Sequence, residues 1–378
     1  MTLANKTVSP DLICLSHLRW NFVWQRPQHL LSRFARGQRV FFVEEPIGTD
    51  EEKARLEVKQ HESGVYVVVP MIPHDQLGSS EGVQRSLLDE LLQNYAIDNY
   101  LLWFYTPMAM GFADHLKPLA TIYDCMDELS AFKNAPQIIK DREQGLFRQA
   151  DLVFTGGQSL YEAKKEQHPK VYAFPSSIEV DHFAKARSIK DDPFDQKSIA
   201  HPRLGFFGVV DERFDIELLK QIAELRPDWQ FVIIGPVVKI DDSVLPRNAN
   251  IHYLGGKNYQ ELPEYIAGWD VALLLFALNE STRFISPTKT PEYLAAGRPV
   301  VSTPIRDVVR PYGEMGFVHI AETAIGFVQS CEEALNENEN ERLKKVDQFL
   351  SQISWDKTQT EMQRLIEEAI ENKKHHAI

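Results

Sequence analysis

Short apolar runs that alternate with helical patterns constrain this chain most. The runs DLICLS (11–16) and RVFFVEE (39–45) flank RPQHLLSRFAR (26–36), whose apolar residues recur at helical spacing. Consecutive parallel strands need a crossover, usually a helix, so this alternation indicates a mostly parallel sheet. Further strands are expected at 65–70, 99–105, 120–125, 151–156 and 170–175, with helices near 82–95, 107–117, 137–149 and 157–167.

A second series with the same alternation follows a charged stretch, 186–202, that contains two prolines. Its strands are expected at 203–208, 228–235, 250–255, 270–276 and 298–303, and its helices at 213–226, 259–268, 289–296 and 321–336. Since 378 residues suit two cores, we predict an α/β protein of two doubly wound, Rossmann-like domains. The predicted division is an N-terminal domain (1–185), a linker (186–202), a C-terminal domain (203–355) and a helix (356–378) that could pack back across the junction.

A net charge of −13 argues against broad nucleic-acid binding, which needs many Lys and Arg side chains. The segment Arg26–Arg39 is basic and has no acid, so it is either a solvated helix face or a local binding patch. No secretory signal or membrane-spanning run is recognisable. We therefore expect a cytoplasmic protein, with peripheral contact at the inner face of the membrane through the N-terminal domain as an open alternative. The oligomeric state is left open.

The segment NESTRFISPTKTPEYLAAGRPVVSTP (279–304) runs from a strand end through a polar loop into a helix. Ser286-Pro287 and Thr290-Pro291 are competing helix starts. Either start leaves backbone N–H groups near Thr288, Lys289 and Thr290, where a helix N-terminus favours an anion. A diphosphate would be stabilised there without a metal ion.

Lys289 and Glu292 are three residues apart and share one face of this helix. One interpretation is an ordinary surface ion pair. The other is that Lys289 holds the phosphates of a nucleotide while Glu292 accepts hydrogen bonds from the ribose hydroxyls.

SPTKTPEYLAAGRPVVST resembles the donor-binding signature of GT-B glycosyltransferases, in particular those of glycosyltransferase family 4. ICLSHLRWNFVWQRPQHLLSRFA (13–35) and YDCMDELSAF (123–132) are similar to a bacterial branch with teichuronic-acid-type and exopolysaccharide transferases. The resemblance implies two domains facing a cleft, a UDP- or GDP-linked sugar donor on the C-terminal domain, and a polysaccharide or lipid-linked acceptor on the N-terminal domain. It also implies retention of anomeric configuration, with no cofactor and no metal.

Carried over by residue, Glu292 matches the second Glu of the family's E-x7-E motif, which binds donor ribose. The first Glu falls at Phe284, so the sequence departs from the motif where the donor sugar lies; Glu280 is a substitute at the wrong spacing. The family's phosphate loop matches GFFGVVDERFD (205–215), which contains Gly208 and Arg213. Lys257 follows a strand end and is a further candidate for nucleotide contact.

Two clusters in the N-terminal half are candidates for the acceptor. Asp124, Asp127 and Glu128 lie at or just beyond a strand end, where they could take part in catalysis, bind a cation or cap the turn. We expect Asp127, and next Asp124, to face the reaction centre. A loop rich in aromatic and basic side chains either binds the acceptor or buries its tryptophans in the core. Its candidates are His17, Arg19, Trp20, Trp24, Gln25 and Arg26.

Other function classes fit less well. No strand is followed by the GxGxxG and acidic residue of a nicotinamide dehydrogenase, and no DxD triplet of a metal-dependent GT-A transferase is present. A non-catalytic sugar-nucleotide-binding or scaffold protein of a polysaccharide assembly complex is the alternative, because Phe284 breaks the motif.

Overall fold

The computed structural model describes residues 9–376, which form two compact units. The first consists of the described residues up to Gly156, of Leu160–Phe174, and of the described residues from Asp356 onward. The second consists of Gly157–Ser159 and Pro175–Trp355. The stretch 186–202, predicted to be a linker, is thus part of the second unit.

The described residues of the first unit form a nine-stranded sheet in the order β3-β5-β2-β1-β6-β7-β8-β9, with β4 paired to β5. The β4–β5 pair is antiparallel, whereas neighbours such as β1–β2 and β1–β6 are parallel. The short edge strands β3 and β4 were not predicted. The strands are β1 (Asp11–Leu15), β2 (Val40–Val43), β3 (Ile47–Thr49), β4 (Arg55–Gln60), β5 (Tyr66–Pro73), β6 (Tyr100–Phe104), β7 (Ala120–Cys125), β8 (Leu152–Thr155) and β9 (Val171–Ala173).

The helices accompanying this sheet mostly match the predicted ones. They are α1 (Arg26–Phe34), α2 (Glu81–Asn94), α3 (Met110–Ala113), α4 (Ile138–Gln149), α5 (Gln158–Lys164) and α13 (Trp355–His376). The helix expected at 107–117 is shorter, because its first turn is a 3-10 turn (Pro107–Ala109) capped by Thr106 and only Met110–Ala113 is α-helical.

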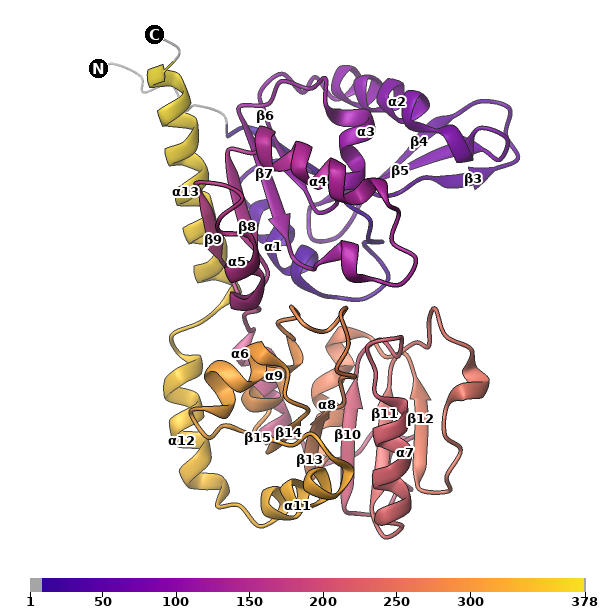
Figure 1. The fold of residues 1–378 in the computed structure, drawn as a ribbon, viewed down its shortest axis with the longest axis vertical. Helices are drawn as coiled ribbons and strands as arrows, with labels where there is room; N and C mark the ends of the chain where they lie inside the picture. Colours follow the sequence, from indigo (N-terminus) through magenta and orange to yellow (C-terminus); the bar gives the residue numbers. More distant parts are fainter. Residues whose placement is uncertain (1–8, 377–378) are drawn as a thin grey trace. The chain divides into compact units, whose positions relative to one another are not determined.

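The basic segment Arg26–Arg39 is divided between the interior and the surface, and its arginines are paired with acids. Arg26, His29 and Arg33 are buried. Helix α13, which lies alongside the first unit in Figure 1, supplies Asp356, whose carboxylate pairs with Arg33 and Arg36. Arg39 pairs with Asp11. The missing acids are thus supplied by residues distant in the sequence.

The described residues of the second unit form a six-stranded sheet in the order β12-β11-β10-β13-β14-β15, with parallel neighbours. Its strands are β10 (Arg203–Phe207), β11 (Gln230–Ile234), β12 (Ile251–Gly255), β13 (Val271–Leu274), β14 (Val300–Ser302) and β15 (Val318–Ile320). Its helices are α6 (Val180–Phe183), α7 (Ile216–Leu225), α8 (Leu262–Ala267), α9 (Lys289–Ala295), α10 (Arg306–Val308), α11 (Ala324–Leu335) and α12 (Glu339–Leu350).

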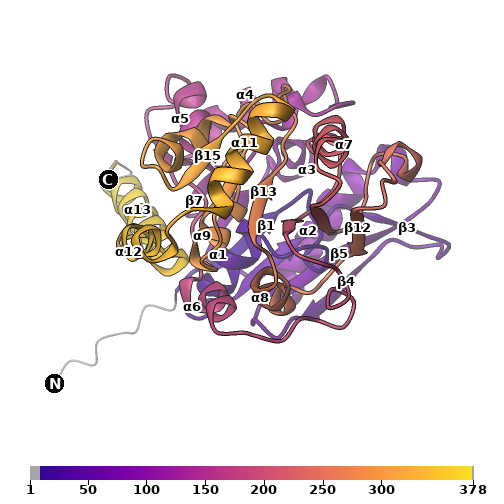
Figure 2. The same ribbon diagram turned by 90° about the horizontal axis from the view of Figure 1, so that it is seen from below.

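Two apolar layers enclose this second sheet. One layer joins residues of α7 and α11 to the sheet, and the other joins residues of α6, α8, α9 and α12 to its opposite face. Figure 2 shows α7 and α11 on one side of β13 and α6 and α8 on the other. The sheet is therefore covered on both faces, as parallel sheets usually are.

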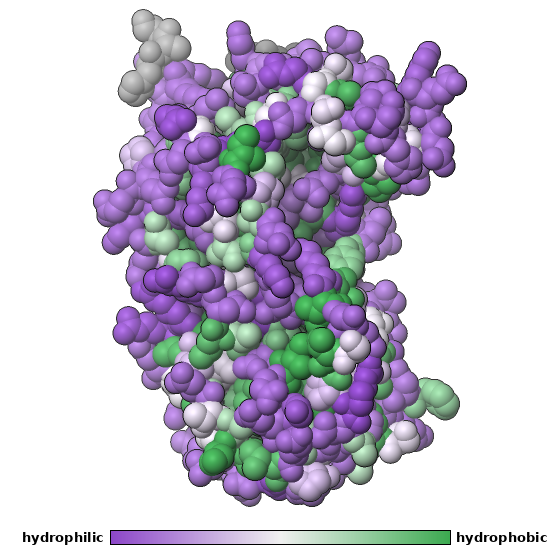
Figure 3. All heavy atoms as spheres, turned by 45° about the vertical axis from the view of Figure 1, so that its right-hand side comes forward, coloured by the Kyte–Doolittle hydropathy of each residue, from purple (hydrophilic) through white to green (hydrophobic). Residues whose placement is uncertain are grey.

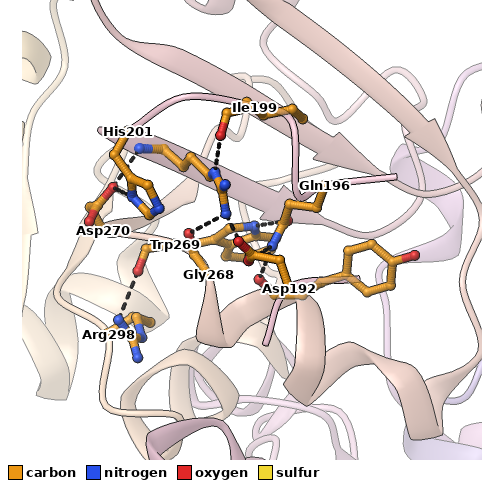
Figure 4. A network of polar contacts seen from close by, with 10 residues as sticks. Asp192, Gln196, Ile199, His201, Gly268, Trp269, Asp270 and Arg298 are labelled. Carbon is orange, nitrogen blue, oxygen red and sulfur yellow. Dashed lines mark hydrogen bonds and ion pairs between the residues drawn. The ribbon is translucent and has the colours of Figure 1, made fainter. Parts of the chain in front are cut away.

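A polar network fastens the stretch before β10 to the second unit (Figure 4). Arg203 donates to the Asp192 carboxylate at 2.8 Å and to the carbonyl of Ile199 at 2.7 Å. The Trp269 indole donates to the Gln196 side chain at 3.0 Å. Because Ile199 is also buried, this stretch is packed against the rest of the second unit.

Among residues 9–376, no helix is both long and apolar enough to cross a membrane. On the face drawn in Figure 3, hydrophilic residues predominate and apolar residues form small groups among them.

A close approach between Gly205 and Trp269 yields a first prediction. A Cβ added to Gly205, in β10, would lie 1.9 Å from Cδ2 of the buried Trp269 ring. Gly205→Ala should therefore lower the free energy of unfolding by roughly 1–3 kcal/mol through overpacking. Denaturant unfolding measures it, with Gly256→Ala as the control, because a Cβ at Gly256 meets nothing within 4 Å. Equal stability of the two variants would contradict the close packing.

Candidate functional site

Gly208 and Lys289 meet at the carboxyl ends of the second sheet's strands. Gly208 follows β10 directly, with a φ of 140°. A Cβ built on it would lie 2.2 Å from Cε and 2.7 Å from Nζ of Lys289, the first residue of α9. The absence of a side chain at Gly208 thus makes room for the lysine. Open α/β sheets bind ligands at this edge.

Gly235 supports the same turn, although it is not among the predicted site residues. A Cβ at this residue would lie 1.8 Å from the carbonyl oxygen of Gly208, and its φ of 141° also favours glycine. Its signal in the sequence is its place directly after β11, equivalent to that of Gly208 after β10.

The Lys289 ammonium has aromatic neighbours. Its Nζ lies 5.6 Å from the ring centroid of Phe206 and 5.7 Å from that of Phe276. Burial lowers the pKa of Lys289 to about 8, and the charge of Glu292 opposes this shift. The lysine side chain thus lies where desolvation disfavours its charged form, and an anionic ligand would stabilise that form.

Glu292 has unused hydrogen-bonding capacity. Its side chain is only 3% exposed, and its Oε2 is buried without a hydrogen-bond partner among the described residues. Burial raises its pKa to about 8, Lys289 opposes this shift, and Glu179 adds to it. The buried hydroxyl of Thr290 likewise has no partner among the described residues. Such groups are costly unless something binds them.

Helix α9 begins at Lys289, between the two starts that the sequence offers. Its N-cap is Thr288, which makes no side-chain capping bond. Ser286 is therefore not the cap. Its hydroxyl accepts a bond from the Ser176 N–H at 3.3 Å, which ties the loop before α9 to the stretch after Pro175.

Arg213 and Lys257 are held by carboxylates of the same unit. The Arg213 guanidinium lies 2.7 Å from Asp211, and its charge also lowers the pKa of Lys289. The Lys257 ammonium lies 2.6 Å from Asp195. Arg213 is thus electrostatically coupled to Lys289, whereas no described interaction links Lys257 to Lys289 or Glu292.

Asp124 and Arg26 occupy different positions from those expected. The Arg26 Nη2 lies 2.8 Å from Asp124 Oδ1, and both side chains are buried, at 3% and 0% exposure. Arg26 is the first residue of α1 and also donates to the Phe174 carbonyl at 2.6 Å. These residues satisfy each other inside the first unit, so neither presents a charge to solvent for catalysis or acceptor binding.

Asp127 lies two residues beyond β7 and is partly exposed. The Cys125 thiol donates to its backbone carbonyl at 3.6 Å, and its charge acts on Arg26. Its neighbour Glu128 pairs with the buried Lys164 at 2.7 Å. Of the three acids in this cluster, Asp124 and Glu128 are thus held by buried cations, whereas Asp127 is partly exposed.

The aromatic and basic loop divides between core and surface. Trp20 is 2% exposed and packs against Phe42 with ring centroids 5.1 Å apart, so it belongs to the core. Gln25 forms a capping box with Gln28 at the start of α1. The remaining candidates are partly exposed: His17, Arg19 and Trp24.

No group of three or more His, Cys, Asp or Glu side chains within residues 9–376 is arranged to hold a metal ion.

Comparisons with known proteins agree with this arrangement. Residues 201–337 match the family described as Glycosyl transferases group 1. Over 284 residues the chain is 25% identical to TuaH of Bacillus subtilis (strain 168), a protein assigned as a glycosyltransferase of teichuronic acid biosynthesis; the match covers 69% of this chain and 70% of TuaH.

Two solved structures show the same fold at low sequence identity. Sucrose-phosphate synthase from Thermosynechococcus elongatus has a TM-score of 0.69 and 13% identity, with 95% of this chain and 98% of that chain covered. Alr3699/HepE from Anabaena, in complex with UDP and glucose, has a TM-score of 0.63 and 13% identity, with 94% and 99% covered. The family match in the second unit, the relative and the fold together identify this protein as a GT-B glycosyltransferase.

Proposed function

We propose that the protein moves a sugar from a UDP- or GDP-linked donor onto a polysaccharide or lipid-linked glycan, in polysaccharide assembly of the cell envelope. The observation that carries the proposal is the buried Glu292 carboxyl group beside Lys289 at the carboxyl edge of the second sheet, one oxygen of which has no hydrogen-bond partner among residues 9–376. The name of the Bacillus relative supports the acceptor class, and the UDP in the Anabaena structure supports the donor class. The cytoplasm, with or without peripheral membrane contact, is the proposed compartment.

The chemistry of the second unit suits a nucleoside diphosphate. A ribose has two vicinal hydroxyls that donate hydrogen bonds, which a buried carboxylate such as Glu292 accepts. A diphosphate supplies the negative charge that Lys289 needs, with Arg213 nearby. Protein cations then stabilise the departing diphosphate, so the proposed reaction needs neither a metal ion nor a cofactor.

Asp127 is the proposed group that orients or deprotonates the acceptor hydroxyl on the first unit. It is a carboxylate just past a strand end and near the surface. Retention of anomeric configuration is part of the proposal and follows from the resemblance to family 4. Phe284 stands at the first position of the E-x7-E motif and is partly buried, so an apolar ring replaces a carboxylate there.

Removing the Lys289 charge should weaken donor binding. Lys289→Ala should raise the Kd of UDP or GDP by an amount equivalent to roughly 1.5–3 kcal/mol, the usual value of a hydrogen bond to a charged group. Calorimetric titration measures it. Lys220→Ala, at an exposed lysine of the same unit, is the control and should bind like the wild type. An unchanged affinity of Lys289→Ala would reject the phosphate role.

Nucleotide binding should also depend on pH. As pH rises through about 8, Lys289 loses the positive charge that a diphosphate needs. Nucleotide affinity should therefore fall between roughly pH 7 and pH 9.5, by up to about tenfold per pH unit. Lys289→Arg should flatten the profile, because arginine keeps its charge. A flat wild-type profile would show that Lys289 does not titrate in this range.

Asp127→Asn tests the acceptor side. It should lower kcat by roughly 10² to 10⁴, the range for a positioned acid or base, while Tm and nucleotide affinity change little. The matched control is Asp114→Asn, at another acid of the same unit, paired with Arg85 on the surface. Wild-type kcat in Asp127→Asn would eliminate the catalytic role, and a large loss of Tm would indicate a structural one.

A further inference from the structure

Within residues 9–376, one face of the β4–β5 hairpin lacks a covering helix. Helix α2 packs on the other face, where its residues Leu87 and Leu91 line a small void with Leu56 and Val68. On the uncovered face, Glu57 is in register with Val69, and Lys59 with Val67. Since side chains alternate between the two faces of a strand, these four residues point to the same side. The loop after β1 approaches this side.

The loop and the hairpin enclose a pocket of about 540 Å³, within the usual range for small-molecule sites. Its lining includes Arg19, Phe22, Glu57, Lys59, Val67 and Val69. All of them belong to the first unit. The pocket is separate from the Lys289–Glu292 site, which belongs to the second unit.

The loop wall is held in place before any ligand binds. The Arg19 guanidinium lies 2.9 Å from Glu44, and the backbone N–H of Trp20 donates to the same carboxylate at 2.8 Å. The Gln28 side chain donates to the Trp20 carbonyl at 2.8 Å. Ligand binding would therefore cost little conformational entropy for ordering this loop, which favours recognition of a ligand.

The charges of the pocket are balanced. Arg19 pairs with Glu44, and Lys59 pairs with Glu57 at 2.8 Å. A phosphate or a carboxylate would have to compete with these acids for the cations, so an uncharged ligand fits better. The ionised pairs still offer both donors and acceptors at the rim.

The apolar part of the pocket is partly aromatic. Phe22 is 49% exposed although it is a large apolar side chain, and Val67 and Val69 lie at the base of the hairpin face. A pyranose ring has an apolar C–H face and a rim of hydroxyls. The C–H face suits the Phe22 ring and the valines, and the hydroxyls suit Glu57 and Lys59.

We propose that this pocket binds an uncharged sugar unit of the glycan acceptor; its role in transfer rests on the proposed function, whereas saccharide binding itself does not. In this proposal the pocket holds the acceptor glycan through a sugar unit that does not itself react. Such remote binding lowers the KM for longer acceptors.

The test measures binding of neutral disaccharides of glucose, galactose and N-acetylglucosamine to the full chain, with UDP and GDP present in excess. Saturation-transfer NMR and titration give the Kd. At least one disaccharide should bind, and Phe22→Ala and Glu57→Gln should each raise its Kd roughly tenfold, about 1.4 kcal/mol. Ile138→Ala is the control, at a similarly exposed apolar side chain (46%) of the same unit.

Three outcomes would overturn the proposal. These are no disaccharide binding at millimolar concentrations, an unchanged Kd in both pocket variants, and binding of octyl-phosphocholine but of no disaccharide, which would assign the pocket to an apolar chain. Tm values confirm that the variants fold. UDP and GDP affinities, measured separately, should stay at the wild-type value in all three variants. If the wild type bound neither UDP nor GDP, the proposed donor site would be contradicted, whereas the conclusion on saccharide binding would be unaffected.

Discussion

Both halves of this protein depend on parallel strands that must be covered on both faces. Parallel neighbours need crossover connections, and the helices in those crossovers bury the sheet. In the second unit, α7 and α11 cover one face while α8 and α9 help to cover the other. Polar groups of the second unit's strands can therefore meet a ligand only where the strands end. Gly208 and Lys289 lie at such an end, and Asp127 lies just beyond β7.

Two buried pairs of opposite charge show how structure and binding differ. Arg26 donates several hydrogen bonds to the Asp124 carboxylate and one to the Phe174 carbonyl. Lys289 and Glu292 influence each other's pKa, yet Glu292 keeps a buried oxygen without a partner in the described part of the chain. A satisfied pair stabilises the interior, whereas an unsatisfied one is costly until a ligand completes it. Of the two, the Lys289–Glu292 pair is therefore the one that we propose as a binding site.

The loop after β1 likewise combines side chains that are packed in the core with side chains that face a pocket. Trp20 fills the core beside Phe42, while Arg19 and Phe22 face a pocket. The aromatic composition of the loop is thus explained by two needs. One need is to bury the sheet beside Phe42, which Trp20 does, and the other is to provide an apolar surface for a ligand, which Phe22 does.

The sequence was enough to predict the α/β class and most of the strands from periodicity, and the proximity of Lys289 to Glu292 from their spacing within one helix. It also indicated Gly208, since a glycine directly after a strand has a local signal. It could not determine that Arg26 pairs with Asp124, that Asp356 neutralises Arg33 and Arg36, or that 186–202 packs on the second unit. Those contacts join residues far apart in the chain. They follow from the tertiary structure, because the partner of a buried charge is set by packing and not by sequence distance.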